Sequence, residues 1–424
     1  MRTTWKRVTI AWAAQVLLST GAPVMAGDED AALPPRANVV DMLVRSPAYQ
    51  ASLRSIEAEQ SVHRQLQVGP QEWRGTVSAA RRTLSGPIGD RTNEWELGLE
   101  RTLRLPGKGA IYDRAGQAKV DQAEAVRQKV WRDQGRLLLD RFGAWLRERE
   151  AARVWLIQAE LLRQQVETVA KRQRIGDAAR IEQQQAEAAF AQTWALAQAA
   201  SGRTLAARDA LDRQFPGLDL TQELAMPTPK AVPAGDAGFI DAQVARSPEL
   251  ELARREADVA AAQMRLDAAE IRPDPTLGLR LGRARSGSEQ YAGVVLSVPF
   301  GGEYRAAGAT AAASRAAAAL QQQLDAQRRV EADAVLHLRQ AQTAYSSWLG
   351  NADAAQRLSE AADSLAKGYR LGEGSLGDVL TARRLANEQQ LAASVGAIDA
   401  WMTRFRLELE TGRLWAQPGP MPQR

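Results

Sequence analysis

The chain has 424 residues, of which 45% are hydrophobic, 25% charged and 5% aromatic, and it contains no cysteine. This composition excludes wholesale disorder, and the lack of cysteine excludes disulfides and thiolate chemistry. The formal net charge of +5 falls to +2 if the leader described next is removed, so the charge gives no case for a nucleic-acid partner.

The first 26 residues are typical of a cleaved secretory signal peptide. Arg2, Lys6 and Arg7 form a basic segment, an apolar run extends from Val8 to Leu18, and Val24-Met25-Ala26 is a small-residue cleavage site. The apolar run is too short to span a bilayer as a helix. We therefore expect an exported protein. Because no later segment has the pattern of a transmembrane helix, any insertion into a membrane would use β-strands.

After the leader, the same series of motifs occurs twice, which indicates a duplicated half-protein. Arg45-Ser46-Pro47 and Arg246-Ser247-Pro248 each predict a helix start, with serine as N-cap and proline as the first helical residue. Arg174-Ile175-Gly176 and Arg370-Leu371-Gly372 match one another further along. We predict a signal peptide at 1–26, a first repeat at 27–214, a linker at 215–236, a second repeat at 237–415 and a disordered tail at 416–424.

Each repeat contains two segments in which apolar and polar residues alternate, the pattern of a strand with one apolar face. The four predicted strands are Trp73 to Leu84, Glu94 to Leu105, Thr276 to Arg285 and Tyr291 to Val298. Each has about ten residues, which suits a tilted strand that crosses a membrane. Arg101 is an exception, since it falls on the otherwise apolar face of its strand.

Long segments without proline follow each strand pair. Residues 109 to 173 and 303 to 369 keep helical spacing over roughly 65 residues, or about 100 Å at 1.5 Å per residue. The return helices, 178 to 213 and 375 to 413, are shorter, and each would match a long helix when added to the opening helix of its repeat. This predicts a bundle of antiparallel helix pairs in which alanines allow close approach.

No group of residues indicates an enzyme, a metal site or a cofactor site. The mature chain has two histidines, His63 and His337, both within helical segments, and no cluster has zinc-ligand spacing. Leu105-Pro106-Gly107-Lys108-Gly109 superficially resembles a phosphate-binding loop. However, Thr102 and Gly109 stand where that motif requires Gly and Ser or Thr. We interpret the segment as a turn from a strand into a helix.

The duplicated layout resembles the outer-membrane efflux proteins of the TolC family from about residue 38 to 415. The resemblance rests on the repeat starts, on Leu97 to Lys108, on Leu296 to Gly302 and on the two tip turns. Gly372 to Leu380 matches the family's tip signature, whereas Glu182-Gln183-Gln184 replaces the usual Asp-Val in the first tip. The proline-glycine corner is most similar to the branch that serves heavy-metal and drug efflux of the resistance-nodulation-division type.

The resemblance implies an α+β membrane protein: a homotrimeric 12-stranded β-barrel, four strands per chain, continued by a long antiparallel α-helical periplasmic barrel. The strand count favours the same assembly, because four strands cannot close a barrel and open edges are not tolerated in lipid. The implied function is the outer-membrane channel of a tripartite efflux system, a passive duct for small molecules or metal ions. The implied partners are a periplasmic adaptor protein, an inner-membrane pump and outer-membrane lipid.

The two tips supply the candidate site residues. Arg174, Gly176, Arg370 and Gly372 belong to turns at which we expect an adaptor or pump to dock. Glu182 and Asp378 follow at matching positions, and a trimer would place up to six carboxylates at the periplasmic entrance, as a tunnel gate. The alternative is that both acids complement the N-terminal dipole of the returning helix. Thr381 stands where the family often has a second tip acid.

Other classes of protein share some of these features. A periplasmic adaptor also has an export signal and a long helical hairpin, but a single hairpin flanked by soluble β-domains. A secreted coiled coil would have neither the alternating strands nor the duplication. Within the duct hypothesis, protein secretion is the alternative to efflux. Cell fractionation separates the classes, since only the duct would be an integral outer-membrane trimer.

Overall fold

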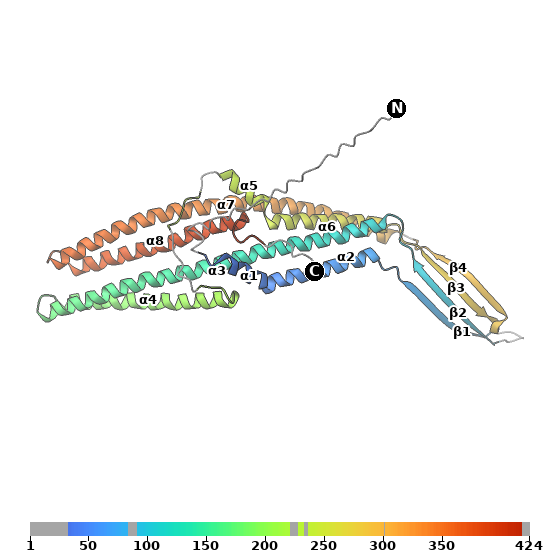
Figure 1. The fold of residues 1–424 in the computed structure, drawn as a ribbon, viewed down its shortest axis with the longest axis horizontal. Helices are drawn as coiled ribbons and strands as arrows, with labels where there is room; N and C mark the ends of the chain where they lie inside the picture. Colours follow the sequence, from blue (N-terminus) through green and yellow to red (C-terminus); the bar gives the residue numbers. More distant parts are fainter. Residues whose placement is uncertain (1–32, 84–90, 221–227, 233–235, 301, 418–424) are drawn as a thin grey trace, which may run out of the picture.

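The computed structural model describes residues 33–83, 91–220, 228–232, 236–300 and 302–417. The molecule is a long rod of helices with a sheet at one end and the tips of two helical hairpins at the other (Figure 1). The predicted signal peptide and most of the predicted tail lie outside the described residues. None of the helices in the described ranges is long and apolar enough to cross a membrane.

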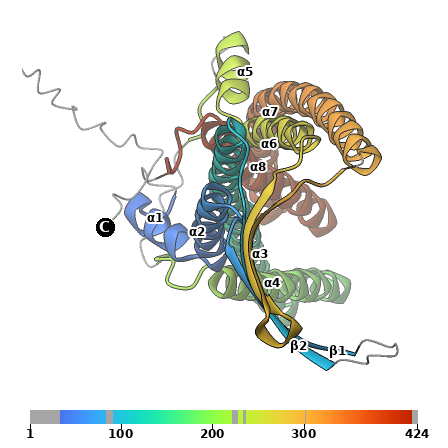
Figure 2. The same ribbon diagram turned by 90° about the vertical axis from the view of Figure 1, so that its right-hand side faces the viewer.

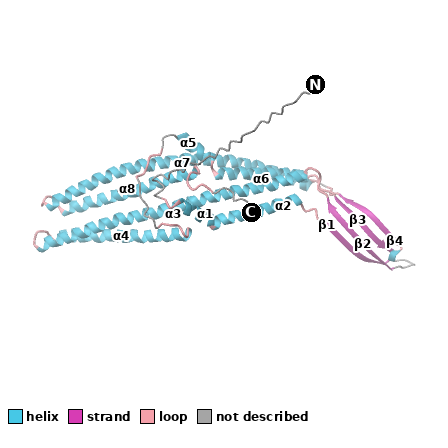
Figure 3. Ribbon diagram, in the orientation of Figure 1, coloured by secondary structure: helices cyan, strands magenta, loops and turns pink. Residues whose placement is uncertain are grey.

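The elements form two corresponding series, coloured by type in Figure 3. The first is α1 (Arg36–Arg45), α2 (Pro47–Val68), β1 (Trp73–Thr83), β2 (Arg91–Thr102), α3 (Lys108–Arg174) and α4 (Arg180–Gln214). The second is α5 (Asp236–Ala245), α6 (Pro248–Glu270), β3 (Thr276–Ala284), β4 (Glu289–Ser297), α7 (Glu303–Arg370) and α8 (Leu376–Glu410). A 3-10 turn, η2 (Arg285–Gly287), joins β3 to β4.

The predicted strands and long helices are confirmed, with ends within three residues of the predicted ones. The helices α1 and α5 were not predicted. Each has 10 residues and ends just before a Ser-Pro pair, so the strong start signal of the next helix concealed the shorter helix. At both predicted starts the serine is the N-cap: Tyr49 N donates to Ser46 Oγ at 3.3 Å, and Leu250 N donates to Ser247 Oγ at 3.2 Å.

The two long helices organise the packing. α3 has 67 residues and α7 has 68, so each is about 100 Å long. α2 and α4 lie end to end along α3, and α6 and α8 lie along α7 in the same way (Figure 1). α6 and α8 also contact α3, which joins the two halves. Two glycines of α3 permit close approach: a Cβ at Gly116 would lie 2.4 Å from His63 Cδ2, and one at Gly143 would lie 2.9 Å from Met402 Cγ.

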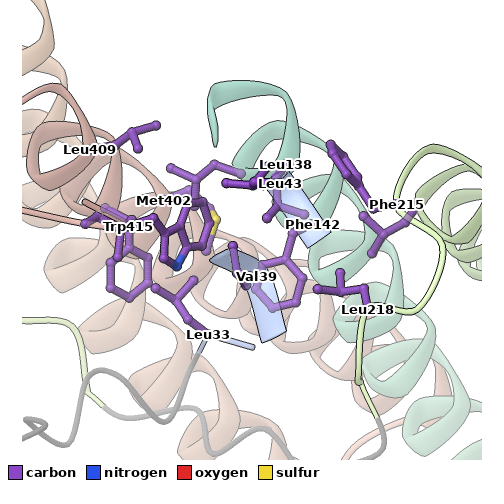
Figure 4. Packing of buried hydrophobic residues seen from close by; sticks show 14 of the residues in the cluster. Leu33, Val39, Leu43, Leu138, Phe142, Phe215, Leu218, Met402, Leu409 and Trp415 are labelled. Atoms are coloured by element: carbon purple, nitrogen blue, oxygen red, sulfur yellow. The ribbon is translucent and has the colours of Figure 1, made fainter. Parts of the chain in front are cut away.

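The main apolar core lies near the middle of the rod. Figure 4 shows α1 residues Val39 and Leu43 packed with Leu138 and Phe142 of α3 and with Met402 of α8. The segment after α8 joins this core through Trp415, whose carbonyl oxygen accepts a 2.9 Å hydrogen bond from Trp131 Nε1. The core therefore fastens α1, α8 and the described C-terminal residues onto the long helix of the first half.

A buried ion network lies beside this core. Arg136 of α3 contacts Glu410 of α8, with Nη2 2.6 Å from Oε2, and also pairs with Glu249 of α6. Arg406 Nε lies 2.9 Å from Glu410 Oε1, and Arg132 Nη1 lies 3.5 Å from Oε2. Only 2% of the Glu410 side chain is exposed. The network thus joins α3 of the first repeat to α6 and α8 of the second repeat at one position along the rod.

Candidate functional site

The sheet has two chemically different faces. Its order is β1-β2-β3-β4, with every pair antiparallel. The register aligns Val77, Leu97, Leu281 and Ala292 in one row across the sheet. Because side chains alternate along a strand, the same face carries the other apolar residues. This apolar face comprises Trp73, Val77, Ala79, Trp95, Leu97, Leu99, Leu277, Leu279, Leu281, Ala292, Val294 and Leu296.

The apolar face is open in the single chain. Val77 is 78% exposed and Val294 is 70% exposed, although both are aliphatic and lie near the middle of their strands. Figure 2, which views the rod from the sheet end, shows the sheet as a thin layer that projects beyond the helices. An exposed apolar surface of this extent indicates contact with lipid or with another protein.

The opposite, polar face carries a ladder of ion pairs between neighbouring strands. Arg74 Nη1 lies 3.0 Å from Glu100 Oε1, and Arg82 Nη2 lies 3.3 Å from Glu94 Oε2. Arg280 Nη1 lies 3.6 Å from Glu96 Oε1. The Tyr291 hydroxyl donates a 2.7 Å hydrogen bond to Glu96 Oε2. The face therefore offers both signs of charge to a polar environment.

Arg101, the predicted exception on the apolar face, is accommodated at the helix end of the sheet. Its guanidinium lies 5.5 Å from the centre of the Trp73 ring, and its Nε donates a 2.9 Å hydrogen bond to the carbonyl oxygen of Gln71. A stacked arginine can keep its charge at the rim of an apolar surface.

Lys108, at the corner between β2 and α3, is paired with the segment that leads from α6 into β3. Its Nζ lies 3.0 Å from Glu270 Oε1 and 2.9 Å from Asp274 Oδ1, and 5% of its side chain is exposed. Asp274 Oδ1 also accepts a hydrogen bond from Leu105 N at 3.0 Å. Gly107, with φ of +88°, supplies the left-handed residue just before α3. Sequence analysis identified this segment as a turn but gave no partner for the lysine.

At the other end of the rod, both tip turns use a left-handed glycine. Gly176 has φ of +79° and Gly372 has φ of +87°, so both lie in the left-handed region that favours glycine. Asp177 N donates to Arg172 O, and Glu373 N donates to Gly368 O at the same spacing. These bonds from the sixth residue back to the first close both helices in the same manner.

The predicted gate acid Glu182 contacts the other hairpin. Tyr369 of α7 donates a 2.6 Å hydrogen bond from its hydroxyl to Glu182 Oε2 at the start of α4. The Arg172 guanidinium lies 4.9 Å from the centre of the Tyr369 ring. Burial and this hydrogen bond raise the pKa of Tyr369 to about 12, so its hydroxyl stays protonated at neutral pH. Sequence analysis did not identify Tyr369.

Asp378 is held differently, within its own helix. Ser375 Oγ donates a 2.8 Å hydrogen bond to Asp378 Oδ2 and accepts one from Asp378 N at 3.2 Å. This is the serine N-cap contact of α8. The structure therefore places Glu182 in a contact between hairpins and Asp378 at a helix terminus. A buried cluster nearby, with Val169 and Ala186 from one hairpin and Leu376 and Val379 from the other, packs the two tips together.

A groove runs between the two hairpins next to the tip turns, on the side toward the sheet. It has a volume of about 410 Å³ and is lined by Arg172, Tyr369, Arg370, Arg383 and Asp363, among others. Arg383 Nη1 lies 2.8 Å from Asp363 Oδ1. Arg174 Nε donates to Ala170 O at 3.3 Å, at the end of α3. Three arginines line this groove, which gives it a basic character.

Neither predicted helical histidine forms part of a metal cluster. His63 Nε2 lies 2.8 Å from Asp113 Oδ1, and His337 Nδ1 lies 3.0 Å from Gln243 Nε2. In the portion of the chain that the structure describes, no group of three or more His, Cys, Asp or Glu side chains is arranged to hold a metal ion.

Comparison with known proteins finds the same architecture among solved structures. No protein-family model and no curated protein sequence matches the chain. Among solved structures, VceC, an outer membrane protein from Vibrio cholerae, has a TM-score of 0.72 at 18% identity and covers 89% of this chain and 96% of its own. A membrane protein from Pseudomonas aeruginosa has a TM-score of 0.75 at 15% identity, over 99% of this chain and 98% of its own.

The open-state MtrE outer membrane channel from Neisseria gonorrhoeae has a TM-score of 0.72 at 16% identity, over 91% of this chain and 90% of its own. The matches span both repeats, including the sheet and the long helices. The chain therefore has the fold of these outer-membrane proteins, the fold that its resemblance to the TolC family implies.

Proposed function

We propose that the chain is the outer-membrane channel of a tripartite efflux system, a passive duct without enzymatic activity of its own. One observation carries the proposal. The sheet has an exposed apolar face and an ion-paired polar face, and its strands lead directly into helices about 100 Å long. A membrane strand of this kind turns its apolar face to lipid and its polar face to an aqueous lumen.

The open edges of the sheet favour a homotrimer. β1 and β4 each have one described neighbour, which leaves backbone donors and acceptors unpaired along the other edge. Unpaired backbone groups are not tolerated in lipid. Three copies, joined β4 to β1, would close twelve strands into a barrel wide enough for a polar lumen. In this arrangement the sheet end lies in the outer membrane and the helices extend into the periplasm.

The tips would form the periplasmic entrance. Tyr369 and Glu182 hold the two hairpins of one chain together, and the same contact in three chains would keep the entrance narrow. Glu182 and Asp378 would bring carboxylates to that entrance and favour cations. Arg174, Gly176, Arg370 and Gly372, with the basic groove beside them, would form the docking surface for a periplasmic adaptor protein and the inner-membrane pump.

The cargo proposed is a small molecule or a metal ion, with the heavy-metal and drug branch as the nearest family type. Protein secretion is the second candidate, and the tip contact counts against it. An entrance fastened by a hydrogen bond in each chain is suited to small solutes, whereas a folded or threaded protein would require wide opening.

Gene deletion and fractionation test this function together. The intact protein is expected in the outer-membrane fraction as a trimer, and its loss should raise susceptibility to toxic small molecules or metal ions while the set of secreted proteins stays unchanged. Recovery in the soluble periplasmic fraction would contradict the channel. Loss of a secreted protein without altered susceptibility would favour the secretion function.

A further inference from the structure

The charges on the sheet are segregated between its faces. Each described arginine on the polar face of the strands, at positions 74, 82 and 280, has a glutamate partner. The glutamates of the described strands, at positions 94, 96, 100 and 289, all lie on that polar face, as the register requires. The apolar face carries only arginines as charged residues within the described strands.

Three of these arginines gather at the loop end of the apolar face, away from the helices. Arg81 lies opposite Asn93, Arg91 lies opposite Thr83, and Arg283 lies opposite Trp95. All three are exposed. We call them the outer arginine rim. No ion pair joins any of the three to another described residue. Arg101, at the opposite end of the apolar face, instead stacks on the ring of Trp73.

A neighbouring copy does not supply the missing anions from its described strands. In the proposed trimer β1 would pair with β4 of the next chain. The described residues on the apolar face of β4 are Gln290, Ala292, Val294 and Leu296, which include no carboxylate. In that trimer the outer arginine rim would therefore continue around the barrel as a cationic band at the loop end of the apolar face.

The side chain of Arg283 extends toward the loop end. A Cβ placed on Gly287, in the turn between β3 and β4, would lie 3.5 Å from Arg283 Nε. The guanidinium is thus directed away from the apolar rows of leucines and toward the level where lipid headgroups would lie. Long basic side chains at the end of a membrane segment adopt this direction because it keeps their charge at the interface.

We propose that the outer arginine rim binds the phosphate groups of a phosphorylated glycolipid in the outer leaflet. The inference rests on the proposed membrane function, which puts the loop end of the sheet in that leaflet. Guanidinium groups bind phosphate through paired charge-assisted hydrogen bonds. Since strands lie about 4.8 Å apart and the register offsets the two residues by two positions along the strands, Arg81 on β1 and Arg283 on β3 are about 12 Å apart. That separation suits one headgroup with two phosphates better than a single phosphodiester.

Binding of fluorescent diphosphoryl lipid A to the full-length purified protein in a neutral detergent tests the proposal. The test variant carries Arg81→Gln, Arg91→Gln and Arg283→Gln. The matched control carries Arg74→Gln, Arg82→Gln and Arg280→Gln, which removes the same charge from the polar face, on β1 and β3. The test variant should bind lipid A about a hundredfold more weakly, because each basic residue near an anionic lipid contributes about a fivefold change. The control should bind as the wild type does.

Equal weakening in both variants, or no weakening in either, would overturn the proposal. Competition by phosphatidylglycerol at the same concentration as unlabelled lipid A would also contradict it, since a single phosphodiester would then suffice. Trimer content is measured for each variant before binding. Replacing the same three rim arginines with lysine instead of glutamine should keep part of the affinity for lipid A, because lysine keeps the positive charge. Conductance in planar bilayers separates the two levels of inference. A wild-type protein that fails to insert contradicts the proposed function, whereas normal conductance with unchanged lipid binding contradicts only the rim.

Discussion

The hydroxyl of Tyr369 donates a 2.6 Å hydrogen bond to the Glu182 carboxylate and thereby joins the two helical hairpins at the tip of the rod. The two residues are 187 positions apart and belong to different repeats. Arg172 covers the tyrosine ring and is itself held by Asp177, whose Oδ2 lies 2.8 Å from Arg172 Nε. The contact at the tip therefore joins the two repeats through a tyrosine of one and an acid of the other, and not through a symmetric pair of acids.

Tyr369→Phe should loosen the entrance. The substitution keeps the ring in the tip cluster and removes one hydrogen bond to a charged group, a change of about 1.5–3 kcal/mol. In planar bilayers we expect the open fraction of the channel to increase about tenfold. Tyr345→Phe, on α7 away from the tip, is the matched control, and an equal effect in both variants would contradict the role of Tyr369.

The same contact predicts a response to alkaline pH. The pKa of Tyr369 is raised from 10.0 to about 12, first by burial and then by the hydrogen bond to Glu182. A raised pKa means that the contact contributes fully below pH 10 and loses its contribution as pH rises toward 12. Wild-type conductance should therefore increase between pH 10 and 12. The Tyr369→Phe variant should show no such increase, and the same rise in that variant would assign the effect to another group.

Glu182→Gln with Asp378→Asn tests the acidic entrance. If the carboxylates act on passing ions, the double variant should lose cation selectivity and block by multivalent cations. The single variants distinguish the two acids. We expect Glu182→Gln to cause most of the loss, because it also weakens the contact with Tyr369 between the hairpins, whereas Asp378 is engaged within its own helix cap. Reversal potentials in a salt gradient measure the selectivity, and unchanged values would leave both acids as structural groups.

Gly372→Val should damage the tip without disturbing the rest of the molecule. No atom lies within 4 Å of a Cβ at this position, so the cost comes from the φ of +87°, which a β-branched residue avoids. We expect export to be lost while the trimer and its membrane insertion remain. Gly350→Ala, in the interior of α7 with open space around it, should instead stabilise by about 0.5–1 kcal/mol. Loss of the trimer in the Gly372 variant would show a purely structural role.

The buried network at Glu410 predicts sensitivity to mutation and to acid. Glu410→Gln removes the carboxylate that Arg132, Arg136 and Arg406 share, and should lower the free energy of unfolding by about 3–5 kcal/mol. Glu160→Gln, which breaks an exposed pair with Arg163, should change it by about 0.5 kcal/mol. Thermal unfolding followed by tryptophan fluorescence compares the two. Similar losses in both would contradict the buried clamp.

Acid should weaken the same clamp. Burial acts to raise the pKa of Glu410, but the hydrogen bond and charge of Arg136 outweigh it and hold that pKa below the ordinary 4.5. A carboxylate whose pKa is lowered in the folded state stabilises the protein above pH 4.5. This stabilisation is lost as the pH falls through the pKa of the folded state. The difference in stability between wild type and Glu410→Gln should therefore shrink below pH 4.5. A constant difference down to pH 2 would contradict this explanation.

The parts of the fold that were predictable are those with local signals. Alternation over ten residues identified the strands from Trp73 and Thr276, and Ser-Pro pairs fixed the starts of α2 and α6. The contacts between repeats had no such signal. Lys108 with Asp274, and Arg136 with Glu410, are brought together only by the stacking of two halves, so no spacing along the chain reveals them.

The two tip acids, Glu182 and Asp378, differ in their contacts although they occupy matching positions in the two repeats. Their matching positions suggested equivalent roles, but the helix starts differ. Ser375 caps α8 and engages Asp378, whereas Ala179 at the same place before α4 has no side-chain oxygen. Glu182 pairs instead with Tyr369, for which the first repeat has Gln173 at the corresponding position. The signal for the Asp378 cap, a serine three residues before an acid, was present in the sequence.

Disulfide crosslinking in native membranes tests the trimeric channel most directly. The chain has no cysteine, so one residue on each edge strand, Val77→Cys on β1 and one of Ala292, Val294 or Leu296→Cys on β4, introduces the only thiols. In a closed barrel of three copies, β4 of each chain pairs with β1 of the next. Oxidised outer membranes should then yield dimer and trimer bands for at least one β4 position, with nothing larger. Monomer bands alone at every position, or a ladder that continues beyond three chains, would contradict the account.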